Sequence, residues 1–159
     1  MNISLIGYNI SYYVKTLKFV APCLTYIVFL FVNYQTPSPI WSNYYITSVA
    51  VFILSNWIGT TFINSEDRTQ QYITRLHVKN ETVYHIYKII SILLFILPFY
   101  ALLIFYPMMI GFFTRSLMAA EILTLFIIHF LFSLMGTSMS MFLIRICKIK
   151  KTTRYRCKR

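Results

Sequence analysis

Long apolar runs alternate with polar segments along this chain, and four of the runs approach the roughly 20 residues that a helix needs to cross a bilayer. In lipid, backbone polar groups must be satisfied within a helix or a closed barrel, and runs of this length fit helices. The pattern therefore predicts an all-α fold, a polytopic transmembrane helical bundle. Its four expected spans are residues 17–33, 44–63, 89–107 and 119–144.

The segments outside these runs are polar or amphipathic. Residues 1–18 carry apolar side chains at helical spacing, with tyrosines and two lysines, which predicts an amphipathic N-terminal helix in the membrane interface; a frayed terminus is the alternative. Because the first apolar run is slightly short, we expect span one to begin inside this helix. Residues 65–88 form a polar loop and residues 145–159 a basic tail, so that residues 1–159 make one transmembrane domain.

Lysine and arginine follow the same alternation. They gather before the first run, between the second and third, and after the fourth, whereas the other two connections hold only Arg115. Cytoplasmic loops retain Lys and Arg because moving them across the membrane is unfavourable. The pattern therefore predicts that both termini are cytoplasmic. Topology and anionic lipid headgroups also account for the formal net charge of +11, so the lipid bilayer is an expected partner and nucleic acid is not.

Composition narrows the class of protein further. The chain is 58% hydrophobic and 12% charged, whereas globular domains carry about 25% charged residues, so a soluble fold could not cover this much apolar surface. The three cysteines form no CxxC motif, which argues against a thiol oxidoreductase. Abundant Ile, Asn, Lys, Phe and Tyr are typical of an AT-rich genome. We therefore expect a multi-pass protein of a bacterial plasma membrane.

No pattern in the sequence indicates catalysis. The four glycines do not form a phosphate-binding loop, and no Ser, Cys or Asp lies in a recognisable nucleophile context. The three histidines, His77, His85 and His129, are not spaced as metal ligands. We therefore expect no enzymatic activity, no metal and no cofactor.

Polar side chains inside the expected spans form a separate group of candidates. His129 is the only ionisable side chain well inside a span, which makes it a functional candidate. Its alternative role, a neutral imidazole bonded across helices, is favoured because no acid lies at similar depth. Asn56 is expected to bond to another helix, and Glu121 to pair with Arg115. Small residues in span four predict close helix packing: Ser133, Gly136, Thr137 and Ser140.

The polar loop between the second and third spans is far longer than a turn requires, and loops of this length are usually functional. Ser65 followed by two acids predicts a helix start, after which Tyr72, Ile73 and Leu76 form an apolar stripe. Asn80 predicts a second helix start that leads into span three. An amphipathic cytoplasmic helix of this kind is suited to docking a soluble partner.

The order of these segments resembles the membrane subunits of type-2 ABC exporters. The resemblance rests on the two spans before the loop, on Glu66 at the start of the loop helix, and on the run 83–90, which carries Lys88 into span three. It implies that residues 69–78 form a coupling helix, on which a cytosolic ATP-binding subunit docks.

On that resemblance, Tyr72, Ile73 and Leu76 would pack into a groove of the ATPase. Arg75 would pair with an acid at the rim of that groove. A second membrane subunit, in a homodimer or a heterodimer, would complete the transport pathway. The family typically has six spans, so this chain would be a permease subunit shortened to four.

Two other functions remain open on the sequence. The first is a small four-span accessory or scaffolding protein of a membrane complex, without a transport pathway of its own, because the polar residues of the spans could all serve packing. The second, a proton-coupled transporter, is weaker because it would need an acid deep in a span, and none is present.

Overall fold

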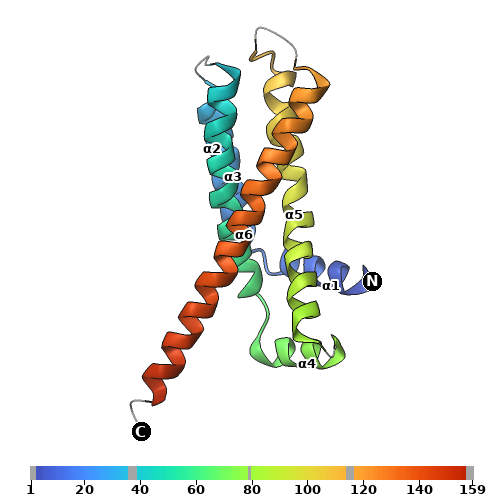
Figure 1. Ribbon diagram of the computed structural model, residues 1–159, viewed down its shortest axis with the longest axis vertical. Helices are drawn as coiled ribbons and strands as arrows, with labels where there is room; N and C mark the ends of the chain where they lie inside the picture. Colours follow the sequence, from blue (N-terminus) through green and yellow to red (C-terminus); the bar gives the residue numbers. More distant parts are fainter. Residues whose placement is uncertain (1–2, 36–38, 79, 114–116, 157–159) are drawn as a thin grey trace.

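The computed structural model describes residues 3–35, 39–78, 80–113 and 117–156. Over these ranges the chain is helical and has no strand, which confirms the prediction of an all-α fold. The helices of the described residues, shown in Figure 1, are α1 (Ile3–Lys15), α2 (Val20–Asn33), α3 (Ile40–Ile63), α4 (Arg68–Val78), α5 (Glu81–Met109) and α6 (Ala119–Arg156).

Three helices of the described part are long and apolar enough to cross a membrane, namely α3, α5 and the Ala119–Cys147 stretch of α6. α2 has 14 residues and qualifies only together with α1, from which it is bent by 81°. At about 1.5 Å per residue, α2 alone reaches about 21 Å, short of a hydrocarbon core of about 30 Å. The structure is therefore a helical bundle with three candidate spans, or four if the bent pair counts as one.

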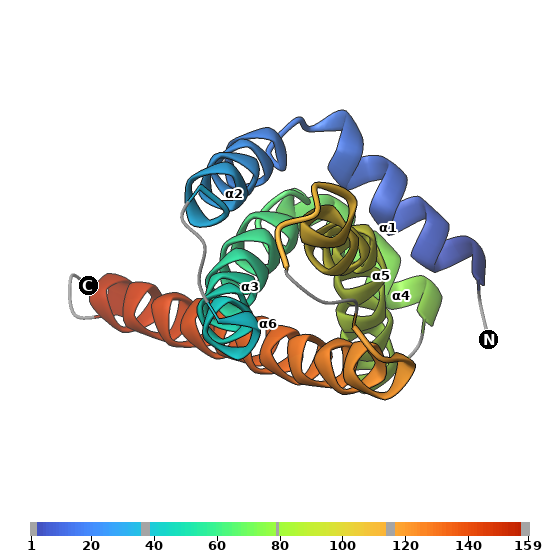
Figure 2. The ribbon, with the colours of Figure 1, turned by 90° about the horizontal axis from the view of Figure 1, so that it is seen from above.

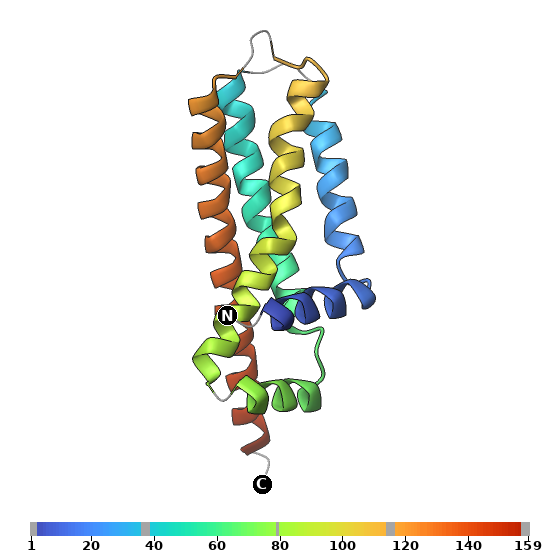
Figure 3. The same cartoon turned by 90° about the vertical axis from the view of Figure 1, so that its right-hand side faces the viewer.

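The long helices form the body of the molecule, and two shorter helices close one end of it. Figure 3 shows α2, α3, α5 and α6 side by side, with α1 and α4 lying crosswise near the lower end. Seen from above in Figure 2, α1 runs along the outside of α5, while α6 crosses the opposite side of the bundle. We refer to the end that carries α1 and α4 as the α4 end.

The chain turns sharply between α1 and α2. Leu17 has a φ of 55°, in the left-handed region that residues with a Cβ rarely adopt. Its amide donates to the carbonyl of Val14 at 3.1 Å and closes the end of α1. A tight turn therefore separates the two helices, and span one begins inside the N-terminal helix, as expected, only if the bent pair counts as one span.

Two other boundaries differ from the expected ones. α3 begins at Ile40, four residues before the expected start of span two, because Pro39 (φ −56°, ψ 141°) precedes the helix instead of ending one. α6 continues as helix through residues 145–156 of the expected tail, where neither Pro nor Gly interrupts it. Residues 157–159 of that tail lie outside the described part.

The expected loop contains a short helix and a run-in to α5, as its pattern predicts. Asn80 caps α5, since its Oδ1 accepts a hydrogen bond from the Thr82 amide at 2.9 Å. The start predicted at Ser65 is wrong. α4 begins at Arg68, and the Ser65 hydroxyl instead donates to the Phe62 carbonyl at 2.6 Å, at the end of α3.

The most extensive helix contact in the described chain joins α3 to α6. A Cβ atom added to Gly136 would lie 2.5 Å from the Phe52 carbonyl oxygen and 3.1 Å from the Asn56 nitrogen, so the two backbones touch there. On the other helix, a Cβ at Gly59 would overlap the side chain of Ser140. Glycine at both positions is what permits this approach.

Hydroxyl groups at the same interface satisfy one another or the helix backbone. Ser55 Oγ donates across the interface to Ser133 Oγ at 3.0 Å. Thr137 Oγ1 donates to the Ser133 carbonyl at 2.8 Å, and Ser140 Oγ donates to the Thr137 carbonyl at 2.7 Å. All four side chains are buried, which is the placement that the packing role predicted for the small residues of span four requires.

α1 packs against the bundle through one buried face, on which Ile6, Asn9 and Tyr13 lie. The Tyr13 ring is 4.7 Å from the Phe62 ring, centroid to centroid, and its hydroxyl lies 2.7 Å from Thr61 Oγ1. The Tyr13 ring also packs on Phe95 of α5, so aromatic burial together with a hydrogen bond fixes α1 on the end of α3 and on α5.

We expect Gly136→Ala to lower the free energy of unfolding by about 1–3 kcal/mol, because the new methyl group meets backbone atoms of α3 that cannot rotate away. Without this contact the same change would raise stability by about 1 kcal/mol, since Ala is the better helix former. The sign of the change, measured by denaturation in detergent, tests the packing. Met139→Leu, on a more exposed part of α6, is the control and is expected to have little effect.

Candidate functional site

The α4 end of the bundle contains a buried ion pair. Glu66 Oε2 lies 2.7 Å from Lys88 Nζ, and each side chain is only 2% exposed. The Tyr84 hydroxyl donates to the same carboxylate oxygen at 2.8 Å, and Lys88 Nζ also donates to the Tyr84 oxygen at 3.0 Å. The three side chains, which we call the buried triad, therefore form a closed triangle of hydrogen bonds.

Local structure holds each member of the buried triad in place. Tyr84 and Lys88 are one turn apart on the same face of α5. Glu66 belongs to the short connection between α3 and α4, whose backbone is held by Gln71. The side chain of Gln71 donates through Nε2 to the backbone carbonyl of Glu66 at 3.0 Å and to that of Ile63 at 3.4 Å. The triad thus joins the end of α3 and the start of α4 to the first turns of α5.

A buried charge is costly unless it is paired and hydrogen-bonded. Here the carboxylate of Glu66 has a cation and a hydroxyl donor, and both lie within 2.8 Å. Removing one partner would leave the other charge buried and unpaired, which strongly destabilises the folded state. The triad therefore fixes the position of the α3–α4 connection on α5.

Arg75 extends the charged cluster from α4. Its Nη1 lies 3.0 Å from Glu81 Oε1 on the first turn of α5, and its guanidinium carbon is 5.3 Å from the centre of the Tyr84 ring. Lys88 Nζ lies at the same distance from that ring. Within the chain Arg75 thus pairs with Glu81, while the role expected for Arg75 at the rim of a partner's groove stays a prediction.

The opposite face of α4 carries the predicted apolar stripe. Tyr72, Ile73 and Leu76 are 65%, 50% and 58% exposed. Gln70, on another face of the helix, donates through Nε2 to the Tyr8 hydroxyl of α1 at 2.9 Å. α4 is therefore held to the bundle by its polar side chains, while its large apolar side chains face outward.

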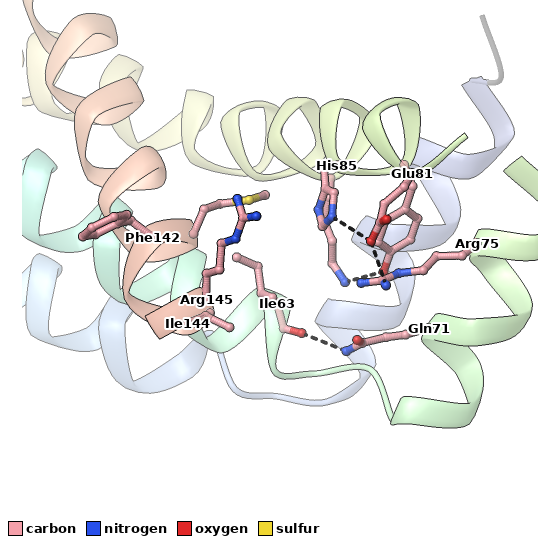
Figure 4. Close-up of a pocket in the computed structure, with 11 residues that line it drawn as sticks. Ile63, Gln71, Arg75, Glu81, His85, Phe142, Ile144 and Arg145 are labelled. Carbon is pink, nitrogen blue, oxygen red and sulfur yellow. Dashed lines mark hydrogen bonds and ion pairs between the residues drawn. The ribbon is translucent and has the colours of Figure 1, made fainter. Parts of the chain in front are cut away.

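A cavity of about 490 Å³ lies beside the buried triad, between α4 and α5 on one side and α3 and α6 on the other. Figure 4 shows Arg75, Glu81 and His85 along one wall and Arg145 with Phe142 along the other. The cavity is thus lined by charged side chains of α4, α5 and α6 and by apolar side chains of α6.

His129 is buried at the α3–α6 interface, far from this end. Its Nδ1 lies 2.6 Å from the Leu125 carbonyl oxygen, so Nδ1 carries a proton and donates. Its Nε2 lies 3.3 Å from Thr47 Oγ1 and 3.5 Å from Ser48 Oγ, both on α3. This is the interhelical hydrogen bonding that the sequence favoured for His129, and both ring nitrogens have partners.

Two further residues, Asn56 and Glu121, were expected to bond to particular partners. Asn56 is half-buried at the α3–α6 contact, but its Oδ1 is buried without a hydrogen-bond partner, so the expected interhelical bond is not made by this atom. Glu121 Oε2 accepts from the Met118 amide at 2.9 Å at the start of α6. Its expected partner, Arg115, lies outside the described residues.

In the sequence analysis, Glu66 and Lys88 serve only to support the resemblance to type-2 ABC exporter subunits. That the two side chains form an ion pair was not predicted. The pair joins residues 22 positions apart, which no local periodicity connects. One signal was available, because Lys88 stands directly before the apolar run that begins at Ile89. A lysine at that position is close to lipid and needs a partner.

Within the ranges that the structure describes, His, Cys, Asp and Glu side chains do not gather in groups that could ligate a metal. Comparisons with protein-family models, with characterised proteins and with solved structures found no match to this chain. The site is therefore interpreted from its geometry.

We expect Glu66→Gln and Lys88→Met each to lower the free energy of unfolding by about 3–5 kcal/mol, because each leaves a buried group without its charged partner. The double variant should be less destabilised than the sum of the two, which a double-mutant cycle in detergent measures. Asp67→Asn alters the neighbouring exposed acid and is the control, expected to stay within about 0.5 kcal/mol of the parent. Additive single changes would show that the two charges do not interact.

Proposed function

We propose that this chain is a membrane-spanning permease subunit of an ABC-type exporter, driven by a separate cytosolic ATPase. The observation that carries the proposal is α4, a short helix at one end of the bundle with three large exposed apolar side chains. An exposed apolar stripe on a helix outside the long spans suits a protein partner.

The buried triad gives such a helix a mechanical role. Force applied to α4 passes through Glu66 into Lys88 and Tyr84, and so into α5, one of the helices long enough to cross the membrane. Arg75 and Glu81 form a second link between the same two helices. ATP chemistry would take place entirely on the partner, and a second membrane subunit would complete the pathway.

The proposal includes an orientation in the plasma membrane. The α4 end, on whose side all Lys and Arg of the expected topology lie except Arg115, faces the cytoplasm, because Lys and Arg are retained on that side. Both termini then lie inside, and α1 lies crosswise in the inner interface, where amphipathic helices with tyrosines and lysines are stable.

Labelling of single cysteines in intact cells tests the orientation. In a background with Cys23, Cys147 and Cys157 changed to Ser, a membrane-impermeant maleimide should label Gln35→Cys and should not label Thr69→Cys. Both positions are exposed and polar, one after α2 and one on α4. Labelling of Thr69→Cys without permeabilisation would invert the assignment.

Co-purification tests the docking role of α4. Tyr72→Asp and Leu76→Asp should each reduce recovery of the ATP-binding subunit at least tenfold, since burying such a side chain is worth about 1.5–3 kcal/mol and about 1.4 kcal/mol is a factor of ten. Thr69→Asp adds the same charge at an exposed polar position of α4 and should leave recovery unchanged. Equal recovery of all three variants would contradict docking through this stripe.

A small accessory or scaffolding protein of a membrane complex is the second candidate. One observation favours it: the buried hydroxyls of the α3–α6 interface bond to one another or to backbone, as groups that serve packing do. Loss of ATPase recovery in the docking variants separates the two candidates.

A further inference from the structure

The cavity at the α4 end has two chemically different walls. Arg75, Glu81 and His85 form a polar wall on α4 and α5, whereas Met141 and Phe142 contribute an apolar wall on α6 (Figure 4). The apolar wall is continuous with the exposed apolar surface of α6, since Phe142 and Leu143 are both exposed. A molecule that fills the cavity therefore meets charged side chains on both walls, Arg75 on one and Arg145 on the other, and the hydrocarbon of Met141 and Phe142 beside Arg145.

The charges around the cavity do not cancel. The chain has four acids, and the two beside the cavity are already paired, Glu66 with Lys88 and Glu81 with Arg75. Arg145, which lines the opposite wall, has no acid within salt-bridge distance in the described structure. One full positive charge is therefore left facing the cavity.

A second observation points to an acceptor at this place. Arg75 Nε is buried and has no hydrogen-bond partner, although Nη1 of the same guanidinium is bonded to Glu81. A buried donor without an acceptor is unfavourable, and a planar guanidinium binds oxyanions through two of its N–H groups. The oxygen atoms of a phosphate would satisfy Arg75 Nε and neutralise Arg145 together.

We propose that this cavity binds the phosphate headgroup of an anionic phospholipid, with its acyl chains lying along Phe142 and the apolar face of α6. Basic pockets between transmembrane helices on the cytoplasmic side are suited to such headgroups. A lipid fits better than a soluble anion because the apolar wall opens onto the surface of α6 and would otherwise face water. The site serves an exporter and a scaffold alike, so of the proposed function it rests only on the orientation that places the α4 end in the cytoplasm.

Native mass spectrometry of the full chain in detergent tests the site. Phosphatidylglycerol should be retained in preference to phosphatidylcholine with the same acyl chains. Arg145→Gln should weaken phosphatidylglycerol retention about tenfold and leave phosphatidylcholine unaffected. Lys15→Gln removes one exposed charge at the same end of the bundle but outside the cavity, and it should match the parent. An equal loss in both variants would mean general charge attraction and would overturn the site.

A second arm separates a lipid from a soluble anion. Phe142→Ser should weaken phosphatidylglycerol retention, because it removes the apolar wall without changing charge, whereas Leu123→Ser, at an exposed apolar position far along α6, should not. Inorganic phosphate at millimolar concentration should fail to displace the lipid. Displacement by phosphate, or retention unchanged by Phe142→Ser, would show that the cavity takes a soluble anion and would contradict the lipid assignment.

Discussion

The pairing of Glu66 with Lys88 is the constraint on which the α4 end of this bundle depends. Both charges are almost wholly buried, so neither can be solvated if the other moves away. Their separation of 2.7 Å requires the end of α3, the start of α4 and the first turns of α5 to keep one arrangement. α4 is too short and too polar to be held by apolar burial, and its position is therefore set by polar contacts.

Different kinds of packing hold the helices together on the two sides of the bundle. Between α3 and α6, glycine and small hydroxyl residues allow close backbone approach, which is the usual solution where lipid removes the hydrophobic drive for helix association. His129 adds polar contacts at the same interface. Around α1 and α5, aromatic rings such as those of Tyr13 and Phe95 fill the space instead. Rigid side-by-side helices thus support the polar cluster at one end.

The sequence predicted what depends on local periodicity. The helical class, the long apolar helices, the cap at Asn80 and the small-residue face at Gly136 all follow from spacing along one segment. What it missed depends on contacts between segments or on one backbone conformation. Arg75 turns inward because Glu81 lies across the next turn of chain, and α1 ends because Leu17 adopts a positive φ. No hydrophobic pattern encodes either event.

The length of α6 has a mechanical consequence. Its 38 residues make a rod of about 57 Å, and at Gly136 its backbone touches that of α3. Arg156 lies 20 residues beyond that contact, or about 30 Å along the helix axis. Pivoting α6 by about 10° at Gly136 would swing its far end by about 5 Å. A rotation of α6 about the tightly packed position Gly136 therefore displaces its basic C-terminal end further than any other part of the helix.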